Sequence, residues 1–182
     1  MSKKSVFAPT IVLVSLCLIA SLLLAVTYQI TLPVIEGIQI KKANVSRAEV
    51  LPEADDFSKV DGLTLYDGVI EVFKANNGAG YVITSKAKGF GGDVTVMTGI
   101  GSDGRITSIK VTDASNETPG LGSKATLPDY TDQYKGAEKV TSEKADGSAT
   151  YIQGVTGASF TSRAVFSCVS SAVMQYQDLG GK

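Results

Sequence analysis

Four hydroxyl side chains lie within seven residues of the stretch GVTGASFTSRAV, which runs from Gly154 to Val165. They are Thr156, Ser159, Thr161 and Ser162, and Arg163 follows them directly. Apolar residues recur with helical period from Val165 onward, so the stretch is expected to lead into a helix. A helix N-terminus presents unpaired N–H groups and a partial positive charge, which suits a phosphate group. The stretch is therefore either an anion site, with Gly157 allowing close backbone approach, or a plain helix cap.

The residue types that are absent restrict the chemistry further. The chain has no histidine, so it lacks imidazole acid–base catalysis and the commonest ligand of zinc, copper and haem. Its two cysteines, Cys17 and Cys168, form no C-x-x-C pair, so this chain alone cannot build a four-thiolate iron–sulfur site. We expect unpaired cysteines, no metal site, and an organic or shared cofactor if electrons are transferred. With 17 basic and 18 acidic residues, the chain has no basic excess that would favour nucleic acid.

A second stretch, NETPGLG from Asn116 to Gly122, has the composition of a tight turn. Pro119 and Gly120 fit the two central positions of a type II turn, because the second position requires a positive φ. A turn of this rigidity would hold the side chains around it in fixed positions.

The stretch VTGASFTS resembles the flavinylation motif of the FMN-binding domain family. That motif runs Asp, two variable residues, Ser or Thr, Gly, Ala, and then an acceptor Thr or Ser. Thr156, Gly157 and Ala158 match it, and the acceptor position falls on Ser159, with Thr161 and Thr156 as the next candidates. The resemblance implies that a flavin transferase joins FMN to this hydroxyl as a phosphoester. Gln153 stands where the family has its acidic residue, which could weaken recognition by the transferase.

The NETPGLG stretch resembles a loop of the G subunit of Rnf complexes and of the related C subunit of the sodium-pumping quinone reductase. The segments GYVITSKAKGFGGDVTVMTGI and SRAV are also similar to the Rnf G subunit. The resemblance implies that this loop lines the flavin. The cofactor-binding residues expected in addition to Ser159 are Thr156, Gly157, Ala158, Thr161, Ser162, Arg163, Glu117, Thr118, Leu121 and Gly122.

The resemblance also implies a function and partners. The chain would be an electron-transfer subunit, with no substrate pocket of its own, of a complex that couples ferredoxin:NAD electron transfer to Na⁺ or H⁺ translocation. Its partners would be the membrane and peripheral subunits of that complex. Two alternatives stay open: the C subunit of a Na⁺-pumping NADH:quinone reductase, which is longer, and a flavin-free membrane-tethered binding or sensor domain, which Gln153 favours. A serine hydrolase is disfavoured because histidine and a G-x-S-x-G motif are absent.

An uncharged run from Ser5 to Ile35 must position this chemistry relative to a membrane. It exceeds the ~20 apolar residues that a bilayer span needs, whereas a cleaved signal, the alternative, has a shorter apolar core. Lys3 and Lys4 precede it, which favours a cytoplasmic N-terminus. We expect a cytoplasmic tail over residues 1–10, a signal anchor over 11–33, a mostly helical stalk over 34–60 that stops near Pro52, and an extracytoplasmic domain over 61–182.

In the outer domain, apolar and polar residues alternate as they do in β-strands. VIEVFKA and YVITSKAKG flank the turn NNGAG, and DVTVMTGI and RITSIKVTDA flank Asp103-Gly104, so two hairpins are predicted. An amphipathic helix follows and ends near Gly180; its apolar face consists of Val165, Cys168, Val169, Ala172, Val173 and Tyr176. The expected fold is α+β, a mainly antiparallel sheet with a C-terminal helix packed on it, preceded by one N-terminal transmembrane helix.

Overall fold

The computed structural model describes residues 4–143 and 149–180, which divide into two compact units at Ala43 and Asn44. The first unit is a helix, because α1 runs without interruption from Lys4 to Val50 and contains Pro9 and Pro33. α1 is long and apolar enough to cross a membrane, and it contains the whole predicted span of 11–33. The helix ends at Val50, two residues before Pro52.

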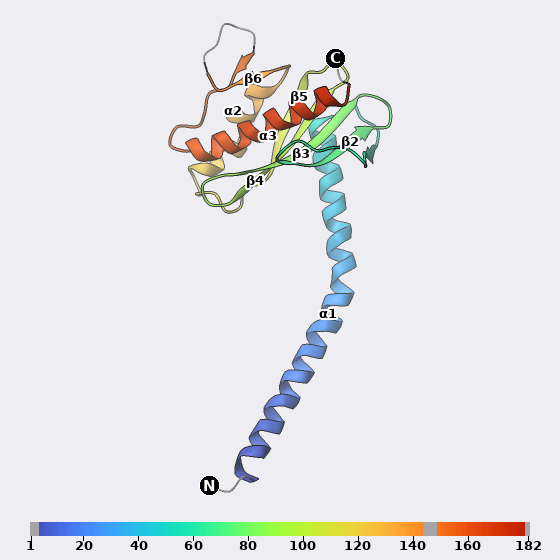
Figure 1. Ribbon diagram of the computed structural model, residues 1–182, viewed down its shortest axis with the longest axis vertical. Helices are drawn as coiled ribbons and strands as arrows, with labels where there is room; N and C mark the ends of the chain where they lie inside the picture. Colours follow the sequence, from blue (N-terminus) through green and yellow to red (C-terminus); the bar gives the residue numbers. More distant parts are fainter. Residues whose placement is uncertain (1–3, 144–148, 181–182) are drawn as a thin grey trace. The chain divides into compact units, whose positions relative to one another are not determined.

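The second unit is built on an antiparallel sheet whose strands follow one another in chain order (Figure 1). The strands are β1 Phe57–Lys59, β2 Val69–Ala75, β3 Gly80–Lys88, β4 Asp93–Gly101 and β5 Ile106–Asp113. Both predicted hairpins are present, β2–β3 and β4–β5, and Gly78 and Gly104 adopt positive φ in their turns. The short strand β1 was not predicted. The sheet thus confirms the expected antiparallel topology.

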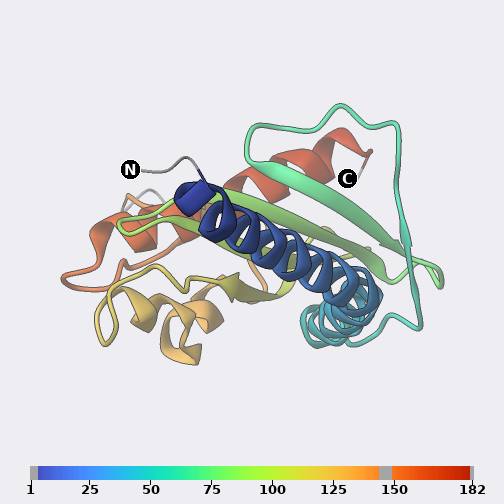
Figure 2. The same ribbon diagram turned by 90° about the horizontal axis from the view of Figure 1, so that it is seen from below.

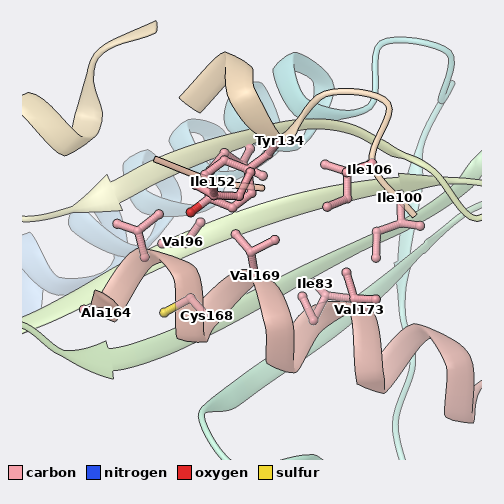
Figure 3. Packing of buried hydrophobic residues seen from close by; sticks show 14 of the residues in the cluster. Ile83, Val96, Ile100, Ile106, Tyr134, Ile152, Ala164, Cys168, Val169 and Val173 are labelled. Carbon is pink, nitrogen blue, oxygen red and sulfur yellow. The ribbon is translucent and has the colours of Figure 1, made fainter. Parts of the chain in front are cut away.

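One face of the sheet is covered by α3, Ser159–Asp178, which crosses it as the predicted C-terminal helix. All six residues of the predicted apolar face are buried. Figure 3 shows Cys168, Val169 and Val173 pointing from α3 toward Val96, Ile83 and their neighbours in the sheet. Burial raises the pKa of the Cys168 thiol to about 12, so this cysteine is the inert core residue expected from the sequence.

The last two turns of α1 pack against part of the opposite face of the sheet. Side chains alternate along a strand, so Glu71, Phe73 and Gly99 face away from α3. Arg47 is 6 % exposed, contacts Glu71 at 3.4 Å, and lies 3.5 Å from the centre of the Phe73 ring. Val50 is also buried, and its carbonyl oxygen accepts a hydrogen bond from Thr107.

The second compact unit begins at Asn44, ahead of the expected start of the domain at residue 61. The end of α1 belongs to this unit, since it buries apolar surface that the sheet would otherwise expose to water. The sequence analysis predicted a mostly helical stalk over these residues. Arg47, the charged residue that is buried, is paired with Glu71.

A short irregular segment closes the side of the sheet next to β5 (Figure 2). It contains η1 Gly122–Thr126, α2 Pro128–Thr131, η2 Asp132–Tyr134 and a parallel pair of strands, β6 Val140–Thr141 and β7 Thr150–Tyr151. Tyr130 and Tyr134 are buried with their hydroxyl oxygens 2.9 Å apart, and burial raises the pKa of both. Tyr130 donates to the Ser162 carbonyl oxygen at 3.0 Å, so this segment supports the first turn of α3.

Gly99→Ala should destabilise the second unit. A Cβ at position 99 would meet the Val50 carbonyl oxygen and lie 2.7 Å from the Thr107 hydroxyl. We expect the free energy of unfolding to fall by about 1–3 kcal/mol, as for other overpacked sites. Denaturant unfolding of the detergent-solubilised full chain measures this change. The matched control is Gly37→Ala on α1, where a Cβ meets no atom within 4 Å. An equal loss of stability in both variants would contradict the described packing of the end of α1 on the sheet.

Candidate functional site

The hydroxyl-rich stretch forms a tight turn that leads into α3. The Ala158 N–H donates to the Val155 carbonyl oxygen at 3.0 Å, and Gly157 adopts φ 81° at the third position of the turn. The N-cap residue is Ala158, and no side chain caps the helix. The interpretation of the stretch as a plain helix cap is therefore wrong, because none of the four hydroxyls caps α3.

Two of the four hydroxyls are buried and committed to protein contacts. The Ser162 hydroxyl oxygen accepts the Val155 N–H at 2.8 Å and so fastens the turn to the helix. Thr161 is 1 % exposed and donates to the carboxylate of Glu117. Thr156 and Ser159 are exposed, and neither hydroxyl bonds to any residue that the structure describes. Of the four hydroxyls in this stretch, only those of Thr156 and Ser159 are therefore free to react.

Glu117 is buried behind the site rather than exposed within it. It is 4 % exposed, and one carboxylate oxygen accepts the Gly91 N–H at 3.1 Å while the other accepts the Thr161 hydroxyl. The neighbouring glycines leave room for it, because a Cβ at Gly122 would lie 2.9 Å from the carboxylate and one at Gly89 would be closer still. Glu117 thus joins the β3–β4 turn, the NETPGLG stretch and α3.

The NETPGLG stretch forms the predicted type II turn. The Leu121 N–H donates to the Thr118 carbonyl oxygen at 3.2 Å, and Gly120 adopts φ 74°. Leu121 projects toward the other motif, because a Cβ at Gly157 would lie only 3.0 Å from its Cδ1. The two motifs that are separated in the sequence therefore meet at Leu121 and Gly157.

An apolar hollow of about 320 Å³ lies beside Ser159, and we call it the aromatic hollow. Phe90 and Phe160 stand 70 % and 60 % exposed at it, with ring centres 6.1 Å apart and planes at 48°. Its full lining is Phe90, Thr118, Leu121, Gly122, Gly157, Ala158, Ser159, Phe160 and Thr161. It contains most of the residues expected to bind a cofactor.

The two phenylalanines were missed by the sequence analysis. Phe90 lies in the glycine-rich turn between β3 and β4, and Phe160 lies between two hydroxyl residues, so neither belongs to a periodic apolar pattern. The available signal was a phenylalanine among small polar residues and glycines in each of the two segments.

A second hollow of about 420 Å³ also has Ser159 in its wall, and we call it the Arg163 hollow. Arg163 lines it with Tyr151 and Phe166, and the Arg163 guanidinium carbon lies 6.0 Å from the centre of the Phe160 ring. Thr156 and Ser162 line this hollow as well. Ser159 thus borders both the apolar aromatic hollow and a second hollow that is lined by the cationic side chain of Arg163.

Gln153 lies outside both hollows. Its backbone is held by Gln133, whose amide accepts the Gln153 N–H at 2.8 Å and donates to its carbonyl oxygen at 3.3 Å. Gln153 is exposed and lines a different depression together with Lys124 and Asp129. The residue that departs from the motif is therefore exposed to an approaching protein rather than to the Ser159 hollows.

Comparison with known proteins shows the family of this chain. Residues 89–174 match the FMN-binding domain. The G subunit of the Na⁺-translocating ferredoxin:NAD⁺ oxidoreductase complex of Acetobacterium woodii is 36 % identical over 97 % of this chain and 94 % of its own length. The G subunit of the proton-translocating complex of Clostridium ljungdahlii is 33 % identical over 99 % of this chain and 97 % of its own length.

Among solved structures, NqrC of Shewanella oneidensis has the same fold, with a TM-score of 0.51 and 19 % identity over 75 % of this chain and 74 % of that one. The full-length similarity and the matched domain agree with the two motifs that meet at Leu121 and Gly157. The chain belongs to the family of G subunits of the ion-translocating ferredoxin:NAD⁺ oxidoreductase (Rnf) complexes and contains an FMN-binding domain.

Proposed function

We propose that this protein is the membrane-anchored electron carrier of an Rnf-type complex and that FMN is joined through its phosphate to Ser159. The observation that carries the proposal is the state of the Ser159 hydroxyl. It is exposed, makes no hydrogen bond to the described residues, and lies at the first residue of a 20-residue helix between the two hollows. Thr161 is disfavoured as acceptor because its hydroxyl is buried against Glu117.

The surroundings of Ser159 suit a phosphodiester. The first N–H groups of α3 have no partner within the helix, and they place partial positive charge beside Ser159. Arg163 lies one turn further along α3 and adds a full positive charge at the adjoining hollow. A phosphate on Ser159 would therefore be neutralised by the backbone and by one exposed cation.

The aromatic hollow fits the flat ring system of FMN. Apolar and aromatic walls with few polar groups are usual for such sites, and 320 Å³ lies at the small end of their range of about 300–1,000 Å³. Phe90 and Phe160 offer ring faces for stacking, and Leu121 offers an aliphatic side. Both phenylalanines are highly exposed, so a flavin ring stacked on them would be accessible to an electron-transfer partner.

FMN supplies the redox chemistry, and the chain's own residues hold and orient it. Ser159 fixes the phosphate, while Phe90, Leu121 and Phe160 restrict the ring. A covalent link keeps the cofactor in place outside the cell. In the attachment step, the Ser159 oxygen forms a new bond to the flavin-side phosphorus of FAD, AMP leaves, and the hydroxyl proton is released. A flavin transferase would catalyse this step and would meet Gln153 on the exposed surface of the motif.

We further propose that α1 anchors the chain with a cytoplasmic N-terminus, so that the FMN-binding domain lies outside the membrane. Lys3 and Lys4 support this orientation by the positive-inside rule. The other subunits of the complex would deliver electrons to the domain and remove them, while ferredoxin, NAD⁺ and the pumped Na⁺ or H⁺ would be handled elsewhere in the complex. The names of the full-length relatives support this assignment over the quinone-reductase alternative.

Ser159→Ala should abolish covalent flavin attachment. Cells that also express a flavin transferase provide the test, because a flavinylated band fluoresces under ultraviolet light on a denaturing gel. We expect loss of the fluorescent band in Ser159→Ala and retention in Ser159→Thr, which keeps a hydroxyl. Ser167→Ala, which removes an exposed hydroxyl of the same helix outside the motif, is the matched control and should still fluoresce. A fluorescent Ser159→Ala band would exclude Ser159 as the acceptor, and a dark wild-type band would favour the flavin-free alternative.

Phe160→Ala should loosen the attached flavin without detaching it. If the ring stacks in the aromatic hollow, removing this phenyl group should lower the fluorescence anisotropy of the flavin and increase its quenching by iodide. Phe90→Ala should act in the same direction. Tyr151→Phe, in the Arg163 hollow, is the control and should leave both measurements unchanged. The reverse pattern would place the ring in the Arg163 hollow.

A further inference from the structure

A buried negative charge lies directly behind the aromatic hollow. Among the described acidic residues, Glu117 alone is buried, and no described cation lies within ion-pair distance of it. We propose that the Glu117 carboxylate lowers the reduction potential of the flavin held in this hollow. The inference rests on the proposed function, since it concerns the same bound flavin.

The carboxylate is close to the wall that the flavin would touch. Gly122 and Thr161 both line the aromatic hollow. One Glu117 oxygen accepts the Thr161 hydroxyl and lies 2.9 Å from the position that a Cβ on Gly122 would occupy. Only a glycine and a threonine hydroxyl therefore separate the charge from this part of the hollow.

The partners of Glu117 are two neutral hydrogen-bond donors. Both of its oxygens accept hydrogen bonds, one from the Gly91 N–H and one from the Thr161 hydroxyl. The two donors are neutral, so neither supplies a positive charge that would offset the charge of a carboxylate at this position.

A buried charge acts on a flavin more strongly than a surface charge does. Reduction adds negative charge to the flavin, which a nearby carboxylate opposes. Water and salt screen exposed charges but affect a buried one much less. For two charges about 12 Å apart at an effective dielectric constant near 20, the effect is about tenfold in the reduction equilibrium, or ~59 mV for one electron.

Glu117 also holds the walls of the hollow together, so a useful variant must separate charge from geometry. In Glu117→Gln the amide oxygen can still accept the Gly91 N–H, and the amide N–H can donate to the Thr161 oxygen. This variant removes the charge and keeps both contacts. Thr161→Val does the opposite, because it keeps the charge and the side-chain shape but removes one donor.

The experiment is a spectroelectrochemical titration of the flavinylated full chain in detergent. We expect Glu117→Gln to raise the midpoint potential by the equivalent of about tenfold, ~59 mV for a one-electron step. Thr161→Val should lower the potential, because the carboxylate loses part of its compensation. Loss of wall geometry alone would move the midpoint potentials of both variants in the same direction.

Unfolding of the flavin-free forms by denaturant checks that each variant is folded. If Glu117→Gln does not fold, Thr161→Val still tests the direction of the shift in potential.

The matched control is Asp93→Asn, which removes an exposed carboxylate beside the same β3–β4 turn. Asp93 is 55 % exposed and paired with Lys86, so any shift it causes should vanish at about 1 M salt, whereas the Glu117→Gln shift should persist. Shifts of one sign in both Glu117→Gln and Thr161→Val, or none in a flavinylated protein, would overturn the inference. Absence of covalent flavin in the wild type would instead contradict the proposed function.

Discussion

The carboxylate of Glu117 is the contact on which the arrangement of the site depends. It ties the type II turn of the NETPGLG stretch to the β3–β4 turn, 26 residues earlier at Gly91, and to the first turn of α3, 44 residues later at Thr161. Each residue around the carboxylate is a sequence neighbour of an apolar residue in the aromatic hollow: Gly91 follows Phe90, Gly122 follows Leu121 and Thr161 follows Phe160. A buried carboxylate is costly without partners, so the three segments must assemble around it together.

This assembly determines which of the four neighbouring hydroxyls are buried and which are exposed. The helix places Thr161 and Ser162 on its inner side, where one binds Glu117 and the other fastens the preceding turn. Thr156 lies in the turn before the helix and Ser159 is its first residue, and both are exposed to solvent. The same stretch thus combines hydroxyls that hold the fold together with hydroxyls that are exposed.

Much of the fold could be predicted from the sequence, whereas several contacts of the candidate site could not, for physical reasons. The hairpins and the buried stripe of α3 follow from periodicity of two and of three to four, which local chemistry fixes. The packing of Arg47 and Val50 on the sheet depends on Gly99, which is distant in the sequence, and no local pattern signals such a match. Glu117 was expected to line the flavin and lies behind the aromatic hollow, because its burial depends partly on Gly89 and Gly91, which come from another segment. Phe90 and Phe160 escaped notice because only the tertiary fold brings the two isolated rings together.

The commitment of Thr161 and Ser162 to internal contacts has a consequence for maturation. In an unfolded chain, four similar hydroxyls would stand within seven residues and compete equally for a modifying enzyme. In the folded domain two of them are withdrawn, and Ser159 is presented at the end of a helix that exists only after α3 has docked on the sheet. Under the proposed chemistry, the yellow cofactor would be attached only to folded copies of the protein. Copies that had not assembled their core would remain colourless and unable to transfer electrons.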